Sequence, residues 1–123
     1  MARRKSLAFL DVGQGDCFVA DTKSGAIIFD GGSSSEDQVG RYRILPYMKY
    51  LGYQKIQIAV ISHMDIDHYS GIKELLEMGK IKYLGLPEIP KDETMKKDHR
   101  YRRKKRKETT YFLFSRPKKI IFY

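Results

Sequence analysis

Hydrophobic and polar positions divide the first ninety residues into short apolar runs separated by polar turns. Three runs near the N-terminus, at residues 7–12, 17–20 and 26–29, are rich in residues that favour β-strands. Glycine-containing segments, residues 13–15 and 23–25, separate them and are typical of turns. The pattern therefore predicts three antiparallel strands in succession.

A helix and then a buried strand are predicted next, after a polar loop at residues 33–40. Residues 43–51 place Ile44, Leu45, Met48 and Leu51 at helical spacing, and Gly52 supplies the stop. Pro46 is tolerated only near a helix start, so we expect the helix to begin close to it. Residues 56–61 (IQIAVI) are mostly apolar on both faces, which predicts an internal strand.

A second helix and a further strand complete the predicted order. Residues 72–78 are amphipathic, with Ser70 as a candidate N-cap and Gly79 as the stop. Residues 82–86 are typical of one more strand. The order βββ-α-β-α-β predicts a single α/β domain with a mixed sheet.

Charge separates the chain into a neutral body and a basic tail. Residues 1–90 hold 11 Lys/Arg and 11 Asp/Glu, so the whole net charge of +9 lies in residues 91–123. Residues 98–107 (DHRYRRKKRK) contain one apolar residue, Tyr101, which is typical of a disordered or solvated arm. Two short apolar runs, residues 111–114 and 120–123, follow it, and the pattern predicts no partner for either.

Length and composition exclude several classes of protein. The 123 residues suffice for one small domain. No segment approaches the roughly 18 to 20 apolar residues of a membrane span, and the first apolar run is too short for a secretory signal. The expectation is a cytoplasmic protein. Cys17, the only cysteine, cannot form an internal disulfide, and we interpret it as a small apolar residue in a strand.

The segment after the predicted internal strand carries candidate chemistry. His63, Asp65, Asp67 and His68 lie within six positions, and the chain has only three histidines in all. His63 and Asp65 can point the same way in extended backbone, and Asp67 and His68 follow in the turn into the helix. Imidazole with carboxylate suits Zn²⁺, Mn²⁺ or Fe²⁺, so the segment predicts a divalent metal site at the end of the sheet.

Other roles for these residues stay open on the sequence alone. Asp67 could cap the helix, and both histidines could be ordinary loop residues. Asp30 precedes Gly31 and Gly32 at a strand end, where an aspartate is also a common turn residue. Asp11 and Asp16 flank residues 13–15, where glycines allow backbone to approach a ligand but also suit a plain hairpin.

Four segments together resemble one family. FLDVGQGDCF, IIFDGG, ILPYMKYLG and VISHMDIDHYSGIKELLE, in this order and at these spacings, resemble the metallo-β-lactamase-fold hydrolases, specifically the domain of ComEC-type competence (DNA-uptake) proteins. The resemblance covers roughly residues 6–90. It implies an αββα sandwich with two divalent metal ions, zinc or manganese, at its edge, and DNA phosphodiesters as the substrate.

The resemblance also implies roles for particular residues. His63 and Asp65 would serve one metal and Asp67 and His68 the other, with Asp65 standing where the family signature has a second histidine. Asp67 would hold the attacking water as general base. Asp30 would orient the ligands, and the rim of the site would hold the residues of the DVGQGD segment, namely Asp11, Gln14 and Asp16.

The later segments of the family are not found in this sequence. No Gly-Asp pair follows Asp16, and His99, the only later histidine, lies in the charged block and is interpreted as solvated. We therefore predict a partial domain at residues 6–90 and a tail at residues 91–123 that does not match the family. Half of a sandwich leaves a sheet edge and face uncovered, which predicts instability, self-association or pairing with another chain.

Two functions follow from these observations. The first is a metal-dependent hydrolase of DNA, active only when something else completes the metal site. The second is a non-catalytic remnant that binds the phosphates of nucleic acid through its basic tail. The residues proposed for that contact are Arg100, Arg102, Arg103, Lys104, Lys105, Arg106 and Lys107.

Overall fold

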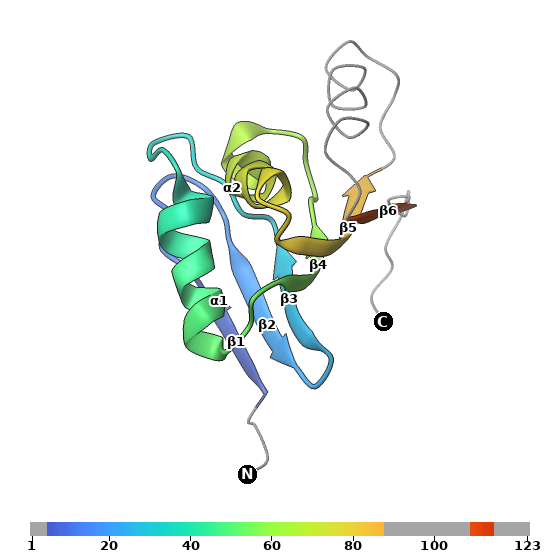
Figure 1. The fold of residues 1–123 in the computed structure, drawn as a ribbon. Coiled ribbons are helices and arrows are strands. Elements are labelled where there is room, and N and C mark those ends of the chain that lie inside the picture. The colour runs from blue at the N-terminus through green and yellow to red at the C-terminus, as the bar shows by residue number, and fades with distance from the viewer. Residues whose placement is uncertain (1–4, 88–108, 115–123) are drawn as a thin grey trace, which may run out of the picture.

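A computed structural model of the chain describes residues 5–87 and 109–114. These residues form a six-stranded sheet and two α-helices (Figure 1). The strands are β1 (Ser6–Phe9), β2 (Phe18–Thr22), β3 (Gly25–Phe29), β4 (Ile56–Val60), β5 (Ile81–Pro87) and β6 (Thr110–Phe114). The helical elements are η1 (Gly40–Ile44), a short π-helix, followed directly by α1 (Leu45–Leu51), and then α2 (Ile66–Glu77).

The sheet is mixed and its strands lie side by side in chain order. β1, β2 and β3 pair antiparallel, whereas β3, β4, β5 and β6 pair parallel. The three predicted antiparallel strands, the mixed sheet and the order βββ-α-β-α-β are confirmed. β4 lies between β3 and β5, so its apolar sequence is that of an internal strand, as predicted.

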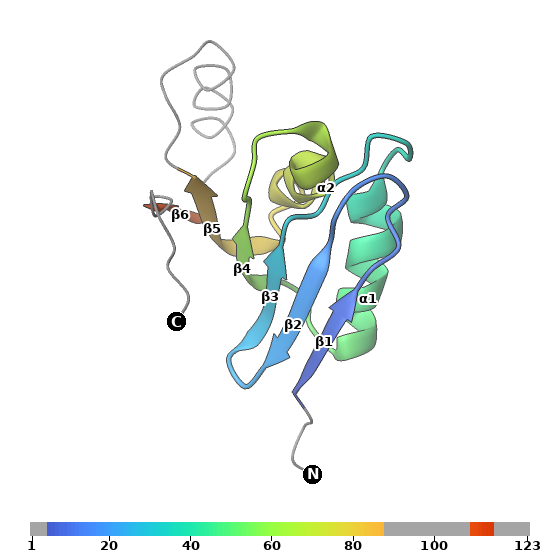
Figure 2. The ribbon, with the colours of Figure 1, turned by 180° about the vertical axis from the view of Figure 1, so that it is seen from behind.

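Both helices cover the same face of the sheet, as the two opposite views show (Figures 1 and 2). The core lies between them and the sheet. Ile28 and Ala59 reach it from the strands, Met48 from α1, and Ile72 and Leu75 from α2, and each is at most 1% exposed. The described fold is thus a helical layer on a sheet, with the second sheet face carrying no helix.

The helix starts differ from the sequence prediction. α2 begins at Ile66, earlier than the predicted residue 72, and Asp65 rather than Ser70 occupies the N-cap position. Apolar periodicity does not report the first turn, because backbone contacts to the preceding loops hold it in place. Helical backbone likewise begins at Gly40, before the predicted start near Pro46, which occupies the first turn of α1 as expected. Gly52 ends α1 with φ of 92°, as predicted.

One strand of the sheet lies outside the part predicted to be folded. Residues 111–114, for which the sequence predicted no partner, belong to β6 and pair with β5 in parallel. The Thr109 hydroxyl donates a hydrogen bond of 2.6 Å to the Ile81 carbonyl. A short apolar run carries no local signal of a distant strand, so only the tertiary pairing reveals it. No helix of the described residues is long and apolar enough to cross a membrane.

Candidate active site

Strand direction brings the candidate residues to one edge of the sheet. β3 and β4 are parallel, so Asp30 after β3 and the segment after β4 leave the sheet at the same end. The first turn of α2 supplies Asp67 and His68, and the loop between β1 and β2 supplies Asp16. These three loops meet where the sequence placed the metal site.

Two glycines allow the loops to meet at backbone distance. A Cβ on Gly15 would lie 1.9 Å from the Gly32 carbonyl oxygen, and a Cβ on Gly32 would lie 2.3 Å from the Ile66 carbonyl oxygen. Neither backbone obstacle can move aside as a flexible side chain could. Glycine at both positions is therefore required for the loops to approach the start of α2.

Backbone hydrogen bonds then fix the start of α2 against these loops. The Asp16 amide donates to the Asp67 carbonyl at 3.1 Å, and the Gly31 amide donates to the His68 carbonyl at 2.7 Å. The Ile72 amide donates to the Gly31 carbonyl at 2.9 Å. Asp67 and His68 are thus positioned by contacts to both preceding loops, and not by the helix alone.

Asp30 lies at the centre of this arrangement in an uncommon backbone conformation. Its φ is 59°, in the left-handed region that aspartate tolerates better than most residues. Its carboxylate accepts hydrogen bonds from the Ser62 amide at 2.7 Å and from the Ser62 hydroxyl at 2.6 Å. The side chain is only 14% exposed. Asp30 is therefore a largely buried, oriented carboxylate and not merely a turn residue.

Ser62 is the site residue that sequence reasoning missed. Besides bonding Asp30, its hydroxyl lies 3.0 Å from His63 Nδ1, so it connects the carboxylate to the first histidine. Its position, directly after β4 and directly before His63, is the signal that could have identified it. A serine next to a predicted ligand can orient that ligand through a hydrogen bond.

His68 faces three carboxylates. Its Nδ1 lies 3.3 Å from Asp30 Oδ2 and 3.6 Å from Asp16 Oδ2, and its Nε2 lies 3.8 Å from Asp67 Oδ2. Its Nδ1 is buried and accepts or donates no hydrogen bond within the described part of the chain. The ring centroids of His63 and His68 are 5.0 Å apart. Five of the predicted residues therefore gather in one cluster of nitrogen and oxygen donors.

The other predicted residues lie at the margin of this cluster. Asp65 is exposed at the N-cap position of α2, and its side chain makes no capping hydrogen bond. Asp11 accepts a hydrogen bond from the Gly13 amide within its own loop at 3.1 Å. Gln14 is exposed and is held through its backbone by Ser34 and Ser35. Asp11 and Gln14 thus shape the loop that carries Asp16.

The cluster as placed does not fit a bound metal ion. In residues 5–87 and 109–114, no three His, Cys, Asp or Glu side chains are arranged to hold one. The donor types suit a divalent cation, but Asp16 and Asp30 face the Nδ1 edge of His68, whereas Asp67 faces the Nε2 edge. The two predicted metal sites of His63, Asp65, Asp67 and His68 stay a prediction.

Cys17 follows Asp16 directly in sequence, and its thiol is weakly reactive. It is 2% exposed just before β2 and belongs to the core, as a small apolar residue would. Burial, and secondly the charge of Asp30, raises the pKa of the Cys17 thiol from 9.0 to about 12. The thiolate that would bind a metal or attack a substrate is therefore strongly disfavoured near neutral pH.

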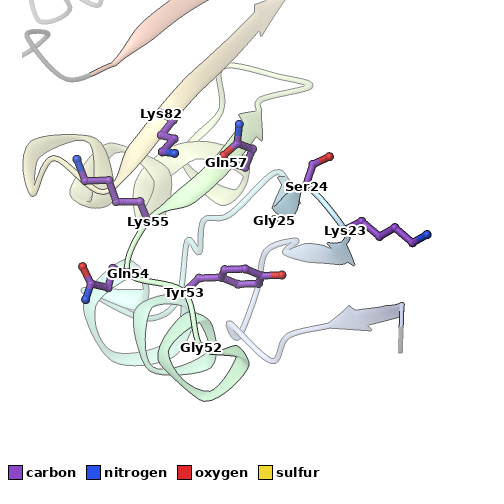
Figure 3. Close-up of a pocket in the computed structure, with 9 residues that line it drawn as sticks. All are labelled: Lys23, Ser24, Gly25, Gly52, Tyr53, Gln54, Lys55, Gln57 and Lys82. Carbon is purple, nitrogen blue, oxygen red and sulfur yellow. The ribbon is translucent and has the colours of Figure 1, made fainter. Parts of the chain in front are cut away.

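A separate hollow of about 420 Å³ lies where β4 and β5 begin, at the opposite end of these strands from the cluster (Figure 3). Lys23, Lys55 and Lys82 lie around it, with Tyr53, and its lining contains no histidine or carboxylate. The side chains of Lys23 and Lys55 point away from each other. This hollow is therefore not the predicted metal site.

Comparison with known proteins identifies the family. Residues 10–121 match the family model described as the metallo-beta-lactamase superfamily. The chain belongs to this superfamily, and its sheet with two helices is consistent with part of that fold. Membership suggests a metal-dependent hydrolase. No curated protein matches the chain. The match extends past residue 90, and the predicted division into a domain at 6–90 and a tail stays a prediction.

Proposed function

We propose that the chain acts in metal-dependent hydrolysis of phosphodiester bonds, with DNA as the substrate and DNA uptake of the ComEC type as the setting. The observation that supports the proposal most directly is the gathering of His63, Asp67 and His68 with two further aspartates at one sheet edge. Superfamily membership supports the reaction class. The DNA substrate rests on the resemblance of the DVGQGD and HMDIDH segments to ComEC-type domains.

The geometry supports distinct roles for Asp67 and His68 in the first turn of α2. The Asp67 side chain is 42% exposed, so it can reach an attacking water and accept its proton. The His68 side chain is only 18% exposed, which suits a residue held in place by its neighbours. We propose Asp67 as the general base, and Asp30 with Ser62 as positioning residues.

The proposal requires more donors than the described cluster provides. Catalytic metal sites usually have three protein ligands for each metal, and no such set is present in the described residues. We propose that residues outside the described ranges, or another chain, complete the site. Metal content of the purified protein tests this step, because a completed site retains metal and an incomplete one does not.

Activity should depend on Asp67 and on added metal. DNA cleavage with Mn²⁺ or Zn²⁺ should fall about 100-fold or more in Asp67→Ala and His68→Ala, because the general base and its neighbour are lost. Glu77→Ala is the matched control, since Glu77 is an exposed carboxylate at the far end of the same helix. Elemental analysis should show metal that is lost in a His63→Ala/His68→Ala double variant.

Two results would count against this function. Cleavage that is equal in wild type and Asp67→Ala would show that another protein or another site is responsible. Retention of DNA at low salt without any cleavage would favour the non-catalytic alternative.

The non-catalytic alternative is supported by the location of the net charge of +9 in residues 91–123. Its proposed contact residues, Arg100, Arg102, Arg103 and Lys104 to Lys107, lie outside the described residues.

A further inference from the structure

The sheet face without helices carries two rows of apolar side chains across the strands. Residues alternate between the faces of a strand, and Val19, Ile28, Ala59 and Leu84 point toward the helices. Their neighbours in sequence therefore point to the other face. In register, one row contains Leu7, Ala20, Ile27, Ile58 and Tyr83 and ends at Thr110. The second row contains Phe9, Phe18, Phe29, Val60, Gly85 and Phe112. We call these two rows the outer sheet face.

Much of the outer sheet face is open to solvent. Phe9 is 83% exposed and Leu7 is 72% exposed, while Phe29 and Tyr83 are each 43% exposed. The aromatic rings also contact one another, with centroids 4.8 Å apart for Phe9 and Phe18 and 5.8 Å apart for Phe18 and Phe29. Exposed apolar patches of this kind mark interaction surfaces in soluble proteins.

We propose that the outer sheet face binds a second copy of this chain, face to face. Neither row contains a charged residue, so two identical faces can pack without burying like charges. A two-layer sheet packing about 10 Å apart is a standard way to bury such a surface. The dimer would then have a layer of helices on each outside and the two sheets between them.

The area available is close to what a stable dimer needs. Because an aromatic side chain can bury about 150–250 Å², the five most exposed members of the face (Leu7, Phe9, Phe29, Tyr83 and Phe112) present roughly 500 Å² per copy. The half-buried members extend this toward the roughly 800 Å² per partner of a standard interface. Among residues 5–87 and 109–114, no helix covers this apolar surface in a single copy (Figure 2).

Other occupants suit the face less well. Nucleic acid and acidic lipid surfaces are recognised by basic side chains, and the rows contain none. Residues 115–123 of the chain itself hold only one run of four apolar residues, which follows three basic residues. Four apolar residues are few for a face of twelve positions in two rows. A second copy brings a complementary apolar face of equal size.

Sedimentation of the full chain across a range of concentrations tests the proposal. We expect a dimer whose dissociation constant rises about tenfold or more in both Phe9→Lys and Tyr83→Lys, because each places a charge within the face. Tyr50→Lys is the matched control, since Tyr50 is 82% exposed on α1, on the helical side of the sheet. Both substituted face positions are already exposed, and circular dichroism confirms that each variant is folded.

Tyr83 distinguishes packing of faces from pairing of sheet edges. β5, which carries Tyr83, lies inside the sheet, whereas β1, which carries Phe9, is an edge strand. Association weakened by Phe9→Lys alone would indicate edge pairing and overturn the proposal. A monomer at all concentrations would also overturn it. If hydroxyl-radical footprinting then showed Phe9 and Tyr83 protected in that monomer, the chain's own residues would be the occupant.

Discussion

At the scale of single residues, the candidate site depends on side chains whose surroundings differ sharply over short distances. Asp67 is partly open to water, while Asp30 is nearly buried and bonded twice to Ser62. Cys17, next to Asp16 in sequence, is in the core, and its pKa is raised to about 12. The sequence identifies these residue types, but exposure assigns them different chemistry.

The Cys17 thiol makes stability depend on pH in a defined range. Its pKa in the folded chain, about 12, lies above the unfolded value of 9.0. The folded state therefore favours the protonated thiol, and this contribution is complete below pH 9 and is lost as pH rises toward 12. Denaturant unfolding from pH 8 to 11 should show a smaller loss of stability in Cys17→Ala than in wild type.

Labelling of the thiol provides an independent check of this prediction. Because the thiolate is the reactive form, iodoacetamide at pH 8.5 should modify Cys17 far more slowly in the folded protein than in denaturant. Equal labelling rates in the two states, or parallel pH profiles for wild type and Cys17→Ala, would contradict the raised pKa.

At the scale of elements, the site is built by the docking of α2 onto two loops. Glycines let the backbones approach, and hydrogen bonds between backbone groups fix the first turn of the helix. For this reason the sequence prediction placed the start of α2 at residue 72, whereas the helix begins at Ile66. Apolar periodicity predicts the part of α2 that faces the core, whereas the first turn is held by main-chain contacts that periodicity does not report.

Gly32 should be a sensitive position in this docking. Gly32→Ala should lower the free energy of unfolding by about 3 kcal/mol or prevent folding, because the added Cβ meets the backbone of α2. Gly31→Ala is the comparison variant, since the nearest atoms to its Cβ belong to the side chains of Ile72 and Ile44, at 3.0 and 3.1 Å, and not to backbone, so its loss should be smaller. Urea denaturation of both variants measures the difference, and equal losses would contradict this account of the docking.

At the scale of the whole molecule, the described sheet is larger than the sequence predicted, and one of its faces carries no helix. β6 extends the sheet beyond β5, with Thr109 buried at 7% and bonded to Ile81. The phenyl ring of Phe112 lies against Gly85 at a distance that leaves no room for a side chain there. Residues far along the chain are thus part of the folded unit, although the apolar run that forms β6 is short.

The buried hydroxyl of Thr109 tests whether this last strand contributes to the stability of the molecule. Thr109→Val keeps the shape but removes the hydrogen bond to the Ile81 carbonyl, so the free energy of unfolding should fall by about 1–2 kcal/mol. Thr110→Val, at the exposed neighbouring position, should change it little. If neither substitution alters the unfolding curve, β6 is not coupled to the rest of the fold.

The sequence by itself determined the order of the first five strands and the two helices along the chain, the superfamily resemblance and the segment that carries the donors. These features are local, because they depend on periodicity, turn residues and spacing within short stretches. Only the tertiary structure decided that Ser62 holds Asp30, that β6 joins the sheet, and that the donors as placed do not form a metal site. Those outcomes depend on contacts between segments distant in sequence, and no local pattern encodes the distance between two side chains on different loops.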